Sequence, residues 1–562
     1  MRRFAALYAE LDASTATEAK LAALARYLAD APPGDAAWAL YFLAGGKPRQ
    51  TVPTALLRAE ATAAAAIPDW LFDACYQAVG DLAETIAQVL PPPNRHSALG
   101  LADWLTERLL PLRGAPPAYQ AECLRRWWDE LPGGERFLLT KLIGGGFRVG
   151  VSKLLVQRAL ARHAGLDAKL VAQRFMGWTD GKTLPTAERL AALVAPETTA
   201  APLSGQPYPF FLAHALDGAA ADLADRLGPP AQWQVEWKYD GIRAQIVKRA
   251  GQVWIWSRGE ELVTERFPEV VAQAATLPDG TVLDGELLAW AGGADRPEPF
   301  QRLQQRLNRK TLSRGLLAEV PVRFIAYDLL EAAGTDLRQQ PQHQRRRQLA
   351  GLLAGAPLAL SPLLAADTWA ALAGHRADSR ARGVEGLMLK HRDAIYGSGR
   401  TKADGVWWKW KVDPYTVDAV LVYAQAGHGR RAGLYTDYTF AVWNRTPADA
   451  AEAAAVVAAI TRREPALPGA LQLVTFAKAY SGLTDAEFKA VDQVIRATTL
   501  EKFGPVRSLR PTLVFELGFE GIARSPRHKS GIALRFPRML RIRGDKPLQE
   551  ADALETLETL LA

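Results

Sequence analysis

The N-terminal third of the chain repeats apolar residues with the period of an α-helix. Segments such as LAALARYLADA, DLAETIAQVL and GLADWLTERLLPL place apolar residues at i, i+3, i+4 and i+7. Proline pairs, as at Pro32-Pro33 and Pro116-Pro117, interrupt this pattern. It predicts an all-α domain over residues 1–202, which runs into the linker-like segment PETTAAPLSGQP.

From about residue 232 the apolar period becomes two, which indicates short strands. WQVEWKYDG, QVWIWSRG, TVLDGELLAW, VRFIAYDLL and VEGLMLKH alternate with helical segments such as FQRLQQRLNRKT, and predict an α+β domain over residues 203–413. Residues 414–562 again carry strand patterns (DAVLVYA, YTFAVWN, LQLVTFA and TLVFELGF) with one or two helices. About five strands in that length predict a small β-barrel, so the fold class is multidomain.

Composition narrows the class of protein. The 562 residues are too many for one core, and no run approaches the ~18 apolar residues of a membrane span. Glu10 and Asp12 interrupt the basic and apolar start too early for a signal peptide. Cys75 and Cys123 are too few for a disulfide framework or a four-cysteine zinc site, and fit a reducing cytoplasm. The net charge of +8 suits a polyanionic partner, although a solvated basic surface explains it equally.

The stretch VEWKYDGIR carries a lysine within an apolar strand pattern. Alternation puts Glu236 and Lys238 on one face of the strand, just before an Asp-Gly turn, with Arg243 beyond it. A partly desolvated lysine near other cations becomes a nucleophile, whereas a single strand lysine is more often one that reaches solvent. The spacing K-x-D-G-x-R favours the nucleophile.

A second lysine pair stands in WWKWK. Lys409 and Lys411 share one face of this strand, and Trp408 and Trp410 share the other. Two ammonium groups on one face repel unless an anion lies between them, and a polyphosphate is such an anion. Solvated lysines on an edge strand are the alternative.

Carboxylates and other polar groups occur in further apolar strands. Glu286 in LDGELLAW and Glu385 in VEGLMLK need a partner, either Mg²⁺ or an arginine. Tyr327 in FIAYDLL is able to stack on a base, although a strand aromatic is more often core. Arg258 in WSRGEE ends a strand and points either into a cleft or to the surface.

A basic run, ALRFPRMLRIRGDKP, lies near the C-terminus. It includes Arg543 and Lys546, and Asp545 is its one acidic residue. Such a run suits phosphates, and a generic nucleic-acid patch is the alternative.

Together and in this order, these segments resemble the six motifs of the ATP-dependent DNA ligases, within the covalent nucleotidyltransferase superfamily: KYDGIR, WSRGEE, LDGEL, VEGLMLK, WWKWK and RFPRMLRIRGDKP, with FIAYDLL as an aromatic-Asp element. The resemblance covers nearly the whole chain. It implies a helical DNA-binding domain, an adenylation domain and an OB-fold domain. It also implies nick sealing through lysyl-AMP and an adenylylated DNA 5′ end, with ATP and Mg²⁺ (or Mn²⁺) as cofactors.

The resemblance also assigns roles, which are expectations at this stage. Lys238 is the AMP acceptor, Glu236 contacts adenine and Tyr327, where the family commonly has Phe, stacks on it. Arg243 and Arg258 are expected to contact ribose or phosphate, and Arg258 also the 5′-phosphate of the nick. Glu286 is expected to bind ribose or metal, and Glu385 to bind metal. Lys409 and Lys411 are expected to contact the α-phosphate, and Arg543, Asp545 and Lys546 to orient the pyrophosphate. Either Arg400 or Lys402 reaches the nucleotide.

DNA contacts are expected outside the nucleotide motifs. FLLTKLIGGGFRVGVSKLLVQRALA is similar to the family's helical DNA-binding domain and carries Arg148 and Ser152. Arg430 and Arg431 stand in AQAGHGRRAGLYTDYTFAV, where a DNA-facing loop of the OB-fold is expected. We expect a monomer in a prokaryotic cytoplasm, with nicked duplex DNA as partner.

Four alternatives deserve comparison. A GTP-using capping enzyme is disfavoured by the helical N-terminal part, and an NAD-dependent ligase by the lack of four zinc-binding cysteines. An RNA ligase usually lacks the RFPR-type motif. A non-catalytic nick-binding protein would not need the motif lysine, which this chain keeps.

Overall fold

The computed structural model describes residues 1–562 except 15, 48–49, 145–148, 182, 197–204, 308, 310–311, 402–405, 428–432, 527 and 562. The chain divides into two compact units, one of residues 1–51, 98–114 and 141–412, the other of residues 52–97, 115–140 and 413–562. The residues before 197 therefore belong partly to each unit. The predicted boundary at residue 202 lies outside the described residues, so the three-domain division stays a prediction.

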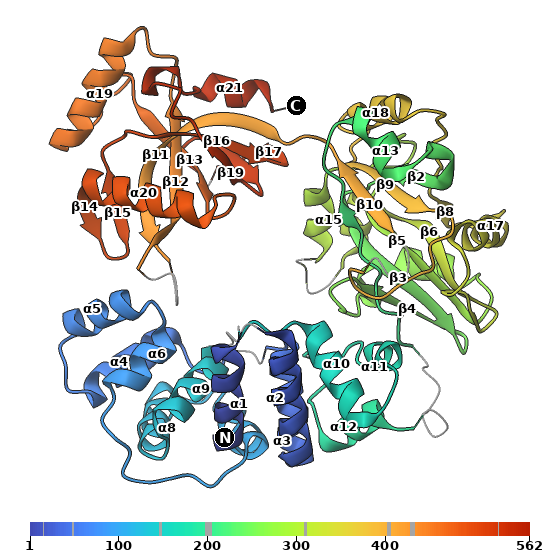
Figure 1. The fold of residues 1–562 in the computed structure, drawn as a ribbon, viewed down its shortest axis with the longest axis horizontal. Helices are drawn as coiled ribbons and strands as arrows, with labels where there is room; N and C mark the ends of the chain where they lie inside the picture. Colours follow the sequence, from blue (N-terminus) through green and yellow to red (C-terminus); the bar gives the residue numbers. More distant parts are fainter. Residues whose placement is uncertain are drawn as a thin grey trace. The chain divides into compact units, whose positions relative to one another are not determined.

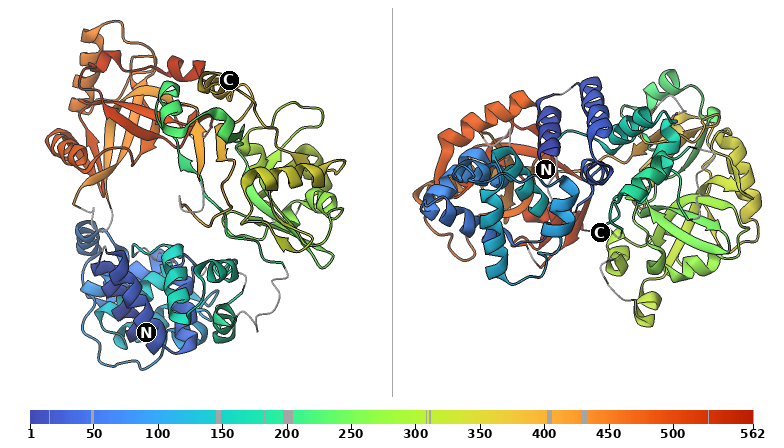
Figure 2. Two further views of the ribbon diagram at one scale, coloured as in Figure 1. Left: turned by 45° about the vertical axis from the view of Figure 1, so that its right-hand side comes forward. Right: turned by 90° about the horizontal axis from the view of Figure 1, so that it is seen from below.

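The described part of residues 1–196 forms helices and no strand. In the first unit, α1 and α2 lie side by side (dark blue in Figures 1 and 2), with the rings of Phe4 and Tyr27 centred 6.2 Å apart. Phe4, Leu7 and Leu11 bury the apolar face that the helical spacing predicts. The elements are α1 (Arg2–Ala13), α2 (Thr17–Asp30), α3 (Pro33–Leu43), α4 (Thr54–Ala64), α5 (Asp69–Val79), α6 (Leu82–Val89), α7 (Leu101–Asp103), η1 (Trp104–Leu109), α8 (Pro117–Asp129), α9 (Gly133–Gly144), α10 (Lys153–Ala164), α11 (Ala168–Arg174) and α12 (Ala187–Val194).

The larger sheet of the first unit has six strands in the described residues and is antiparallel except where β8 joins β6. Its strands are β3 (Ile242–Arg249), β4 (Gln252–Ser257), β5 (Thr281–Ala289), β6 (Val322–Ala332), β7 (Thr335–Asp336) and β8 (Ala359–Leu360). Their apolar face forms one core with apolar residues of α14 (Pro268–Ala274), α15 (Phe300–Leu307), α16 (Arg314–Glu319) and α17 (Gln342–Leu353). Helix α17 packs against β6 (Figure 1), so its arginines lie beside the strand that carries Tyr327.

A second sheet of the first unit, in the order β1-β10-β9-β2, carries the two lysine motifs. Its strands are β1 (His214–Ala215), β2 (Trp233–Trp237), β9 (Gly386–His391) and β10 (Trp407–Lys411). Near it lie η3 (Ala220–Asp222), α13 (Leu223–Leu227), η4 (Pro230–Gln232) and α18 (Trp369–Ala377), and η5 (Thr264–Arg266) follows β4. Val235, Trp237 and Tyr239 enter its core, as the alternation predicted. Two predicted strand positions were wrong by one residue, because β2 ends before Lys238 and β9 begins after Glu385.

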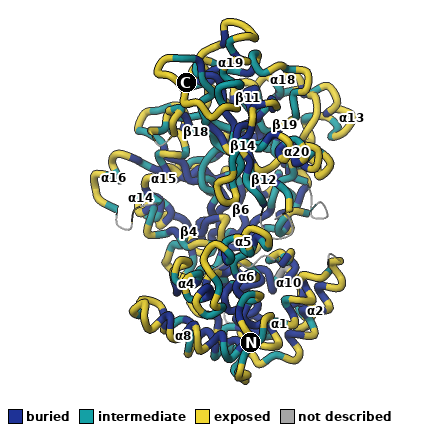
Figure 3. Tube along the Cα trace, turned by 90° about the vertical axis from the view of Figure 1, so that its left-hand side faces the viewer, coloured by how far each residue is buried: buried dark blue, intermediate teal, exposed yellow. Residues whose placement is uncertain are grey.

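In the second unit, the described part of residues 413–562 builds a seven-stranded sheet around β11, with a separate two-stranded pair. The buried residues of β11 are dark blue in Figure 3, whereas α19 is mostly exposed or half-buried. The four predicted strand segments fall in β11, β12, β13 and β16; the additional strands are short hairpins and edges with little alternation to read. The elements are β11 (Tyr415–Ala426), β12 (Tyr435–Trp443), α19 (Ala450–Arg462), β13 (Leu473–Ala479), α20 (Asp485–Thr498), β14 (Thr499–Phe503), β15 (Val506–Leu509), β16 (Val514–Phe519), β17 (Gly521–Arg524), β18 (Ile532–Arg535), β19 (Arg538–Ile542), η7 (Leu548–Glu550) and α21 (Leu554–Thr559).

Among the described residues, no helix combines the length and the apolar character that crossing a bilayer would require.

Candidate active site

The first unit contains a cavity between its two sheets that collects most of the residues singled out in the sequence. The empty space within the cavity and its mouth, which opens to solvent, is about 760 Å³. Its lining includes Glu236, Lys238, Arg243, Arg258, Glu286, Tyr327, Arg400 and Lys409, together with Met388, Lys390 and Trp407.

Lys238 reaches this cavity from the end of β2. Its backbone N–H donates to the Gly386 carbonyl at 2.8 Å, and the Glu385 N–H donates to the Lys238 carbonyl at 2.7 Å. Gly386 has φ of +136°, and a Cβ there would lie 2.3 Å from the Trp410 carbonyl oxygen, so only glycine permits this approach of the strands. The backbone thereby places Glu385 beside Lys238, and the Lys238 ammonium donates to Oε2 of Glu385.

Positive side chains gather around Lys238. Burial lowers the pKa of Lys409, and the charges of Lys411, Arg400, Lys238 and Arg258 lower it further. Lys411 does not line the cavity, and its Nζ lies 3.6 Å from Oε2 of Glu385. Such a group of cations is stabilised by a bound polyanion, which is what the alternation in WWKWK predicted. Lys409 therefore faces the cavity, whereas Lys411 is one-third exposed, and the phosphate role of the pair stays a prediction.

The two glutamates expected to bind metal or arginine have lysine neighbours. Glu385 pairs with Lys238 and Lys411, which is neither of the predicted partners. Burial raises the pKa of Glu286 to about 7, opposed by the positive charges of Lys238 and Arg243. The Tyr327 hydroxyl donates to Oε2 of Glu286 at 3.4 Å. Glu286 therefore changes its charge near neutral pH, as befits a ligand that exchanges a proton for a cation.

No group of three or more His, Cys, Asp or Glu side chains suited to a metal ion occurs among the described residues. Glu286 and Glu385 nevertheless fit Mg²⁺, because this ion commonly takes one or two carboxylates and completes its shell with water and substrate phosphates. Each carboxylate acts electrostatically on the other, since the Glu385 charge raises the pKa of Glu286.

Glu236 is almost fully buried and is held by two cations. Arg346 of α17 donates to its Oε1 at 3.0 Å, and the Lys390 ammonium lies 2.6 Å from its Oε2. Lys390 also lies 4.3 Å from the ring centre of Tyr327. The sequence interpretation missed both cations. Lys390 ends the segment VEGLMLK, so its place in a motif could have drawn attention to it. Arg346 lies 110 residues from Glu236, outside every motif, and nothing in the sequence pattern indicates that the two meet.

Arg243 is fixed by a second buried carboxylate. It donates to Asp284 from Nε at 3.1 Å and from Nη2 at 2.6 Å, and Tyr396 donates to the same carboxylate at 2.6 Å. Burial by itself would lower the pKa of Arg243, but Asp284 and the nearby tyrosines raise it well above the ordinary value. Its remaining Nη1 donates to the Phe211 carbonyl at 2.6 Å. Arg243 is therefore a rigid, permanently charged part of the wall.

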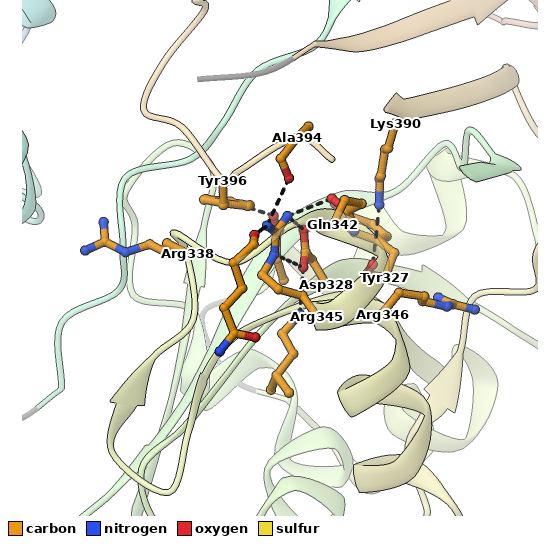
Figure 4. A network of polar contacts seen from close by, with 12 residues as sticks. Tyr327, Asp328, Arg338, Gln342, Arg345, Arg346, Lys390, Ala394 and Tyr396 are labelled. Atoms are coloured by element: carbon orange, nitrogen blue, oxygen red, sulfur yellow. Dashed lines mark hydrogen bonds and ion pairs between the residues drawn. The ribbon is translucent and has the colours of Figure 1, made fainter. Parts of the chain in front are cut away.

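A further polar network supports the side chains on β6 and α17 (Figure 4). Arg345, which is fully buried, donates to both oxygens of Asp328 at 2.8 and 2.9 Å. It also donates to Oε1 of Gln342 at 2.7 Å and to the Ala394 carbonyl at 3.2 Å. Because Asp328 follows Tyr327 and Arg345 precedes Arg346, this network fixes the backbone beside Tyr327, which lines the cavity, and beside Arg346, which holds Glu236.

The remaining predicted residues lie elsewhere. Arg543, Asp545 and Lys546 belong to the second unit, where Arg543 pairs with Asp545 and with Asp418. Ser152 caps α10, because its hydroxyl accepts from the Leu155 N–H at 3.2 Å. Outside the described residues lie Arg148, Lys402, Arg430 and Arg431. Between Arg400 and Lys402, the structure therefore places only Arg400, in the cavity wall.

The sequence matches two family models. One, described as “ATP dependent DNA ligase domain”, matches residues 211–411, and one described as “DNA ligase N terminus” matches residues 1–161. A probable DNA ligase of Koribacter versatilis is 32% identical over 517 residues, which cover 87% of this chain and 82% of the relative. A DNA ligase of Haloferax volcanii is 36% identical over 358 residues, 63% of this chain and 56% of that relative.

A probable DNA ligase of Opitutus terrae is 34% identical, and the aligned part spans only 48% of its length. Among solved structures, one described as “Pmar-Lig_Pre.” resembles 96% of this chain and 99% of its own, with a TM-score of 0.60 at 14% identity. At that identity the likeness shows the fold alone. On the two family models and the Koribacter relative, the chain belongs to the ATP-dependent DNA ligases and is an enzyme.

Proposed function

We propose that this chain seals nicks in duplex DNA that carry a 5′-phosphate and a 3′-hydroxyl. The observation that carries the proposal is the position of Lys238, in a cavity whose wall also presents Lys409, Arg258 and Arg400. A nucleophilic amine surrounded by cations is suited to attack a phosphorus atom, because the cations stabilise the charge that develops on the phosphate oxygens.

In the first step the Lys238 nitrogen forms a bond to the α-phosphorus of ATP, and the bond from that phosphorus to the bridging oxygen of pyrophosphate breaks. The ammonium first gives up a proton so that its lone pair is available. Glu385, to which Lys238 donates, is placed to receive that proton or to hold a cation in its stead. Lys409 and Lys411 contact the α-phosphate, and pyrophosphate leaves.

The base and sugar occupy the side of the cavity away from these lysines. Glu236 accepts a hydrogen bond from the adenine amino group, and Tyr327 stacks on the ring. Arg243 and Arg258 hold ribose or phosphate, and Glu286 binds ribose or metal. Support for the Glu236 role is its fixed orientation between Arg346 and Lys390.

A bound Mg²⁺ (or Mn²⁺) would be held by Glu385 and Glu286 and would shield the charge of the phosphates. Its release on raising the proton concentration is expected, because Glu286 takes up a proton near pH 7.

In the later steps the AMP passes to the 5′-phosphate of the nick, where Arg258 holds that phosphate. The 3′-hydroxyl then attacks the 5′-phosphate, the new phosphodiester forms and AMP leaves. Arg543, Asp545 and Lys546 act only while ATP is attacked, by orienting pyrophosphate. They belong to a region, residues 414–562, whose strand-rich composition supports an OB-fold.

DNA is held by the helical region, residues 1–202, including Arg148 and Ser152, and by Arg430 and Arg431. The net charge of +8 supports a polyanionic partner. We further propose that the enzyme works as a monomer in a prokaryotic cytoplasm, in repair, recombination or replication, in keeping with its bacterial and archaeal relatives.

The test is to incubate the chain separately with α-labelled ATP, α-labelled GTP or NAD labelled in its AMP part, and to resolve the products on a denaturing gel. We expect label on the protein from ATP alone, and sealing of a nicked duplex when ATP and Mg²⁺ are present. Label from GTP or NAD but not from ATP, or sealing of nicked RNA but not DNA, would overturn the proposal.

A further inference from the structure

A single acidic residue of β11 holds together the cations of the C-terminal basic motif. The Asp418 carboxylate accepts from Nη1 of Arg543 at 3.1 and 2.9 Å, and from the Lys546 ammonium at 2.7 Å. All three side chains are largely enclosed, with 12%, 17% and 19% of their surfaces exposed. Both cations therefore lie within 3 Å of the same oxygen, Oδ2.

The backbone reinforces this arrangement. The Asp418 N–H donates to Oδ2 of Asp552 at 2.7 Å, and the Asp552 N–H donates to the Asp418 carbonyl at 2.8 Å. The Arg543 N–H donates to the Val514 carbonyl at 2.8 Å. Strand β11 is thus tied to both ends of the segment that runs from Arg543 to Asp552, and Asp418 lies at the junction.

We propose that Asp418 is a positioning residue for the attack on ATP, which presets Arg543 and Lys546 as a cation pair for the departing pyrophosphate. This inference rests on the function proposed above for Arg543 and Lys546. Asp418 touches neither nucleotide nor DNA in this scheme, and acts only through the two cations.

The physical reason is the repulsion between two positive side chains. An ammonium and a guanidinium this close repel each other, and the carboxylate between them removes that cost. Without it, Lys546 regains its rotamers and Arg543 keeps only Asp545, so ordering the two cations around an anion costs more and weakens binding.

The two cations have different tasks. Arg543 also donates to Asp545, from Nε at 3.0 Å and from Nη2 at 2.9 Å, so most of its N–H groups are committed to the two carboxylates. Lys546 has three N–H donors, and in the described structure one of them serves Asp418. We assign Lys546 the direct contact with pyrophosphate. Arg543 holds the carboxylates of Asp545 and Asp418 in fixed positions through its hydrogen bonds.

Strand β16 offers a matched control. Glu516 is the partner of Asp418 in the pairing of β11 with β16, and its carboxylate accepts from Nε of Arg541 at 2.5 Å. Glu516→Gln therefore removes a carboxylate from the same sheet that forms no ion pair with Arg543 or Lys546, although its charge contributes to the raised pKa of Arg543.

The experiment compares the wild type with Asp418→Asn, Glu516→Gln, Lys546→Met and the double variant of Asp418→Asn with Lys546→Met. Each protein is assayed for the rate of labelling by α-labelled ATP, and for sealing of a nick whose 5′ end already carries AMP. The second substrate needs no pyrophosphate departure, so it reports folding, DNA binding and the last chemical step.

We expect Asp418→Asn to slow labelling by about 30-fold, the size of one lost charge-assisted hydrogen bond, and to seal the pre-adenylylated nick at the wild-type rate. Glu516→Gln should label at the wild-type rate. The double variant should lose less than the product of the two single losses, because part of the effect of Asp418 passes through Lys546.

Three results would overturn the inference: wild-type labelling by Asp418→Asn, equal loss on both substrates, or losses that multiply in the double variant. Failure of the proposed function has a different signature. In that case the wild type would itself gain no label from ATP, or Lys546→Met would label normally.

Discussion

Replacing Arg346 by methionine tests how the cavity recognises the base. Arg346 is the buried partner of Oε1 of Glu236 and also donates to the Ser361 carbonyl, whereas Lys390 holds Oε2. Methionine keeps much of the length and apolar stem of arginine and removes its charge. The carboxylate then keeps one cation and loses the contact that fixes its orientation.

The expected magnitude follows from burial. Glu236, Arg346 and Lys390 have 3%, 8% and 2% of their side-chain surfaces exposed, so solvent screens these pairs little. Removing one partner of an isolated buried ion pair costs about 3–5 kcal/mol. Here Lys390 continues to neutralise Glu236, so the loss is closer to that of one charged hydrogen bond, about 2 kcal/mol, or about 30-fold in an equilibrium constant.

The assay is the initial rate of covalent labelling as a function of ATP concentration. Because Lys238 and the phosphate contacts are untouched, we expect the KM for ATP to rise by about 30-fold at most, and the rate at saturating ATP to change by less than about threefold. Discrimination against GTP should fall as well, since guanine has a carbonyl where adenine has the amino group that we propose as the donor to Glu236.

Arg347→Met is the matched control, because Arg347 is the next residue of α17 and is exposed. It should leave both constants unchanged. A KM for Arg346→Met within twofold of the wild type, or an equal fall of the saturated rate and of rate over KM, would refute the reasoning about base recognition.

Three further predictions follow from individual contacts. Burial raises the pKa of Glu286 to about 7, so its carboxylate forms only as pH rises through about 7. Labelling at limiting Mg²⁺ should therefore increase over that range in the wild type and not in Glu286→Gln. Because the folded state holds this proton up to a higher pH than the unfolded state, the wild type should lose stability relative to Glu286→Gln between about pH 4.5 and 7 and show a constant difference above and below that window, which thermal melting against pH would show. Asp284→Asn leaves Arg243 without its buried partner and should cost about 3–5 kcal/mol, visible as earlier urea unfolding, whereas Tyr396→Phe should cost about 1 kcal/mol; equal costs would contradict the assignment. Ser152→Ala should lower the stability of the helical region by about 1 kcal/mol, and Ser152→Gly by a few tenths of a kcal/mol, because glycine is a better helix cap than alanine. If both variants lose the same affinity for nicked DNA, Ser152 contacts DNA. If the loss of affinity follows the loss of stability, Ser152 serves only as the helix cap.

The parts of the site that lie on strands were predictable because alternation is a local property. Glu236 and Lys238 line the cavity and Val235 lies in the core, as the period of two required, whereas Trp237 and Tyr239 belong to the core and also reach the cavity wall. The strand ends were wrong by one residue at Lys238 and Glu385, because pairing with a neighbouring strand decides where a ladder stops.

The partners of the charged residues were not predictable from the pattern. Arg346 reaches Glu236 from a helix 110 residues away, and Asp418 reaches Arg543 across 125 residues. The pairing of Glu385 with Lys238 was not foreseen, and its metal binding stays a prediction. Such pairs depend on how separate elements pack, and a single sequence contains no periodic signal for that. The sequence pattern predicted the four main strands of residues 414–562. The shorter strands of this region were not predicted, because four or five residues are too few to show a clear alternation.

The central claim is that the Lys238 amine accepts AMP. The direct measurement is to incubate the chain with ATP and Mg²⁺, digest it and locate the AMP by mass spectrometry, beside Lys238→Arg treated in the same way. The account predicts AMP on the peptide that contains Lys238, and none anywhere on Lys238→Arg. AMP on Lys409, Lys411 or Lys390 in the wild type, or retained AMP on Lys238→Arg, would contradict it.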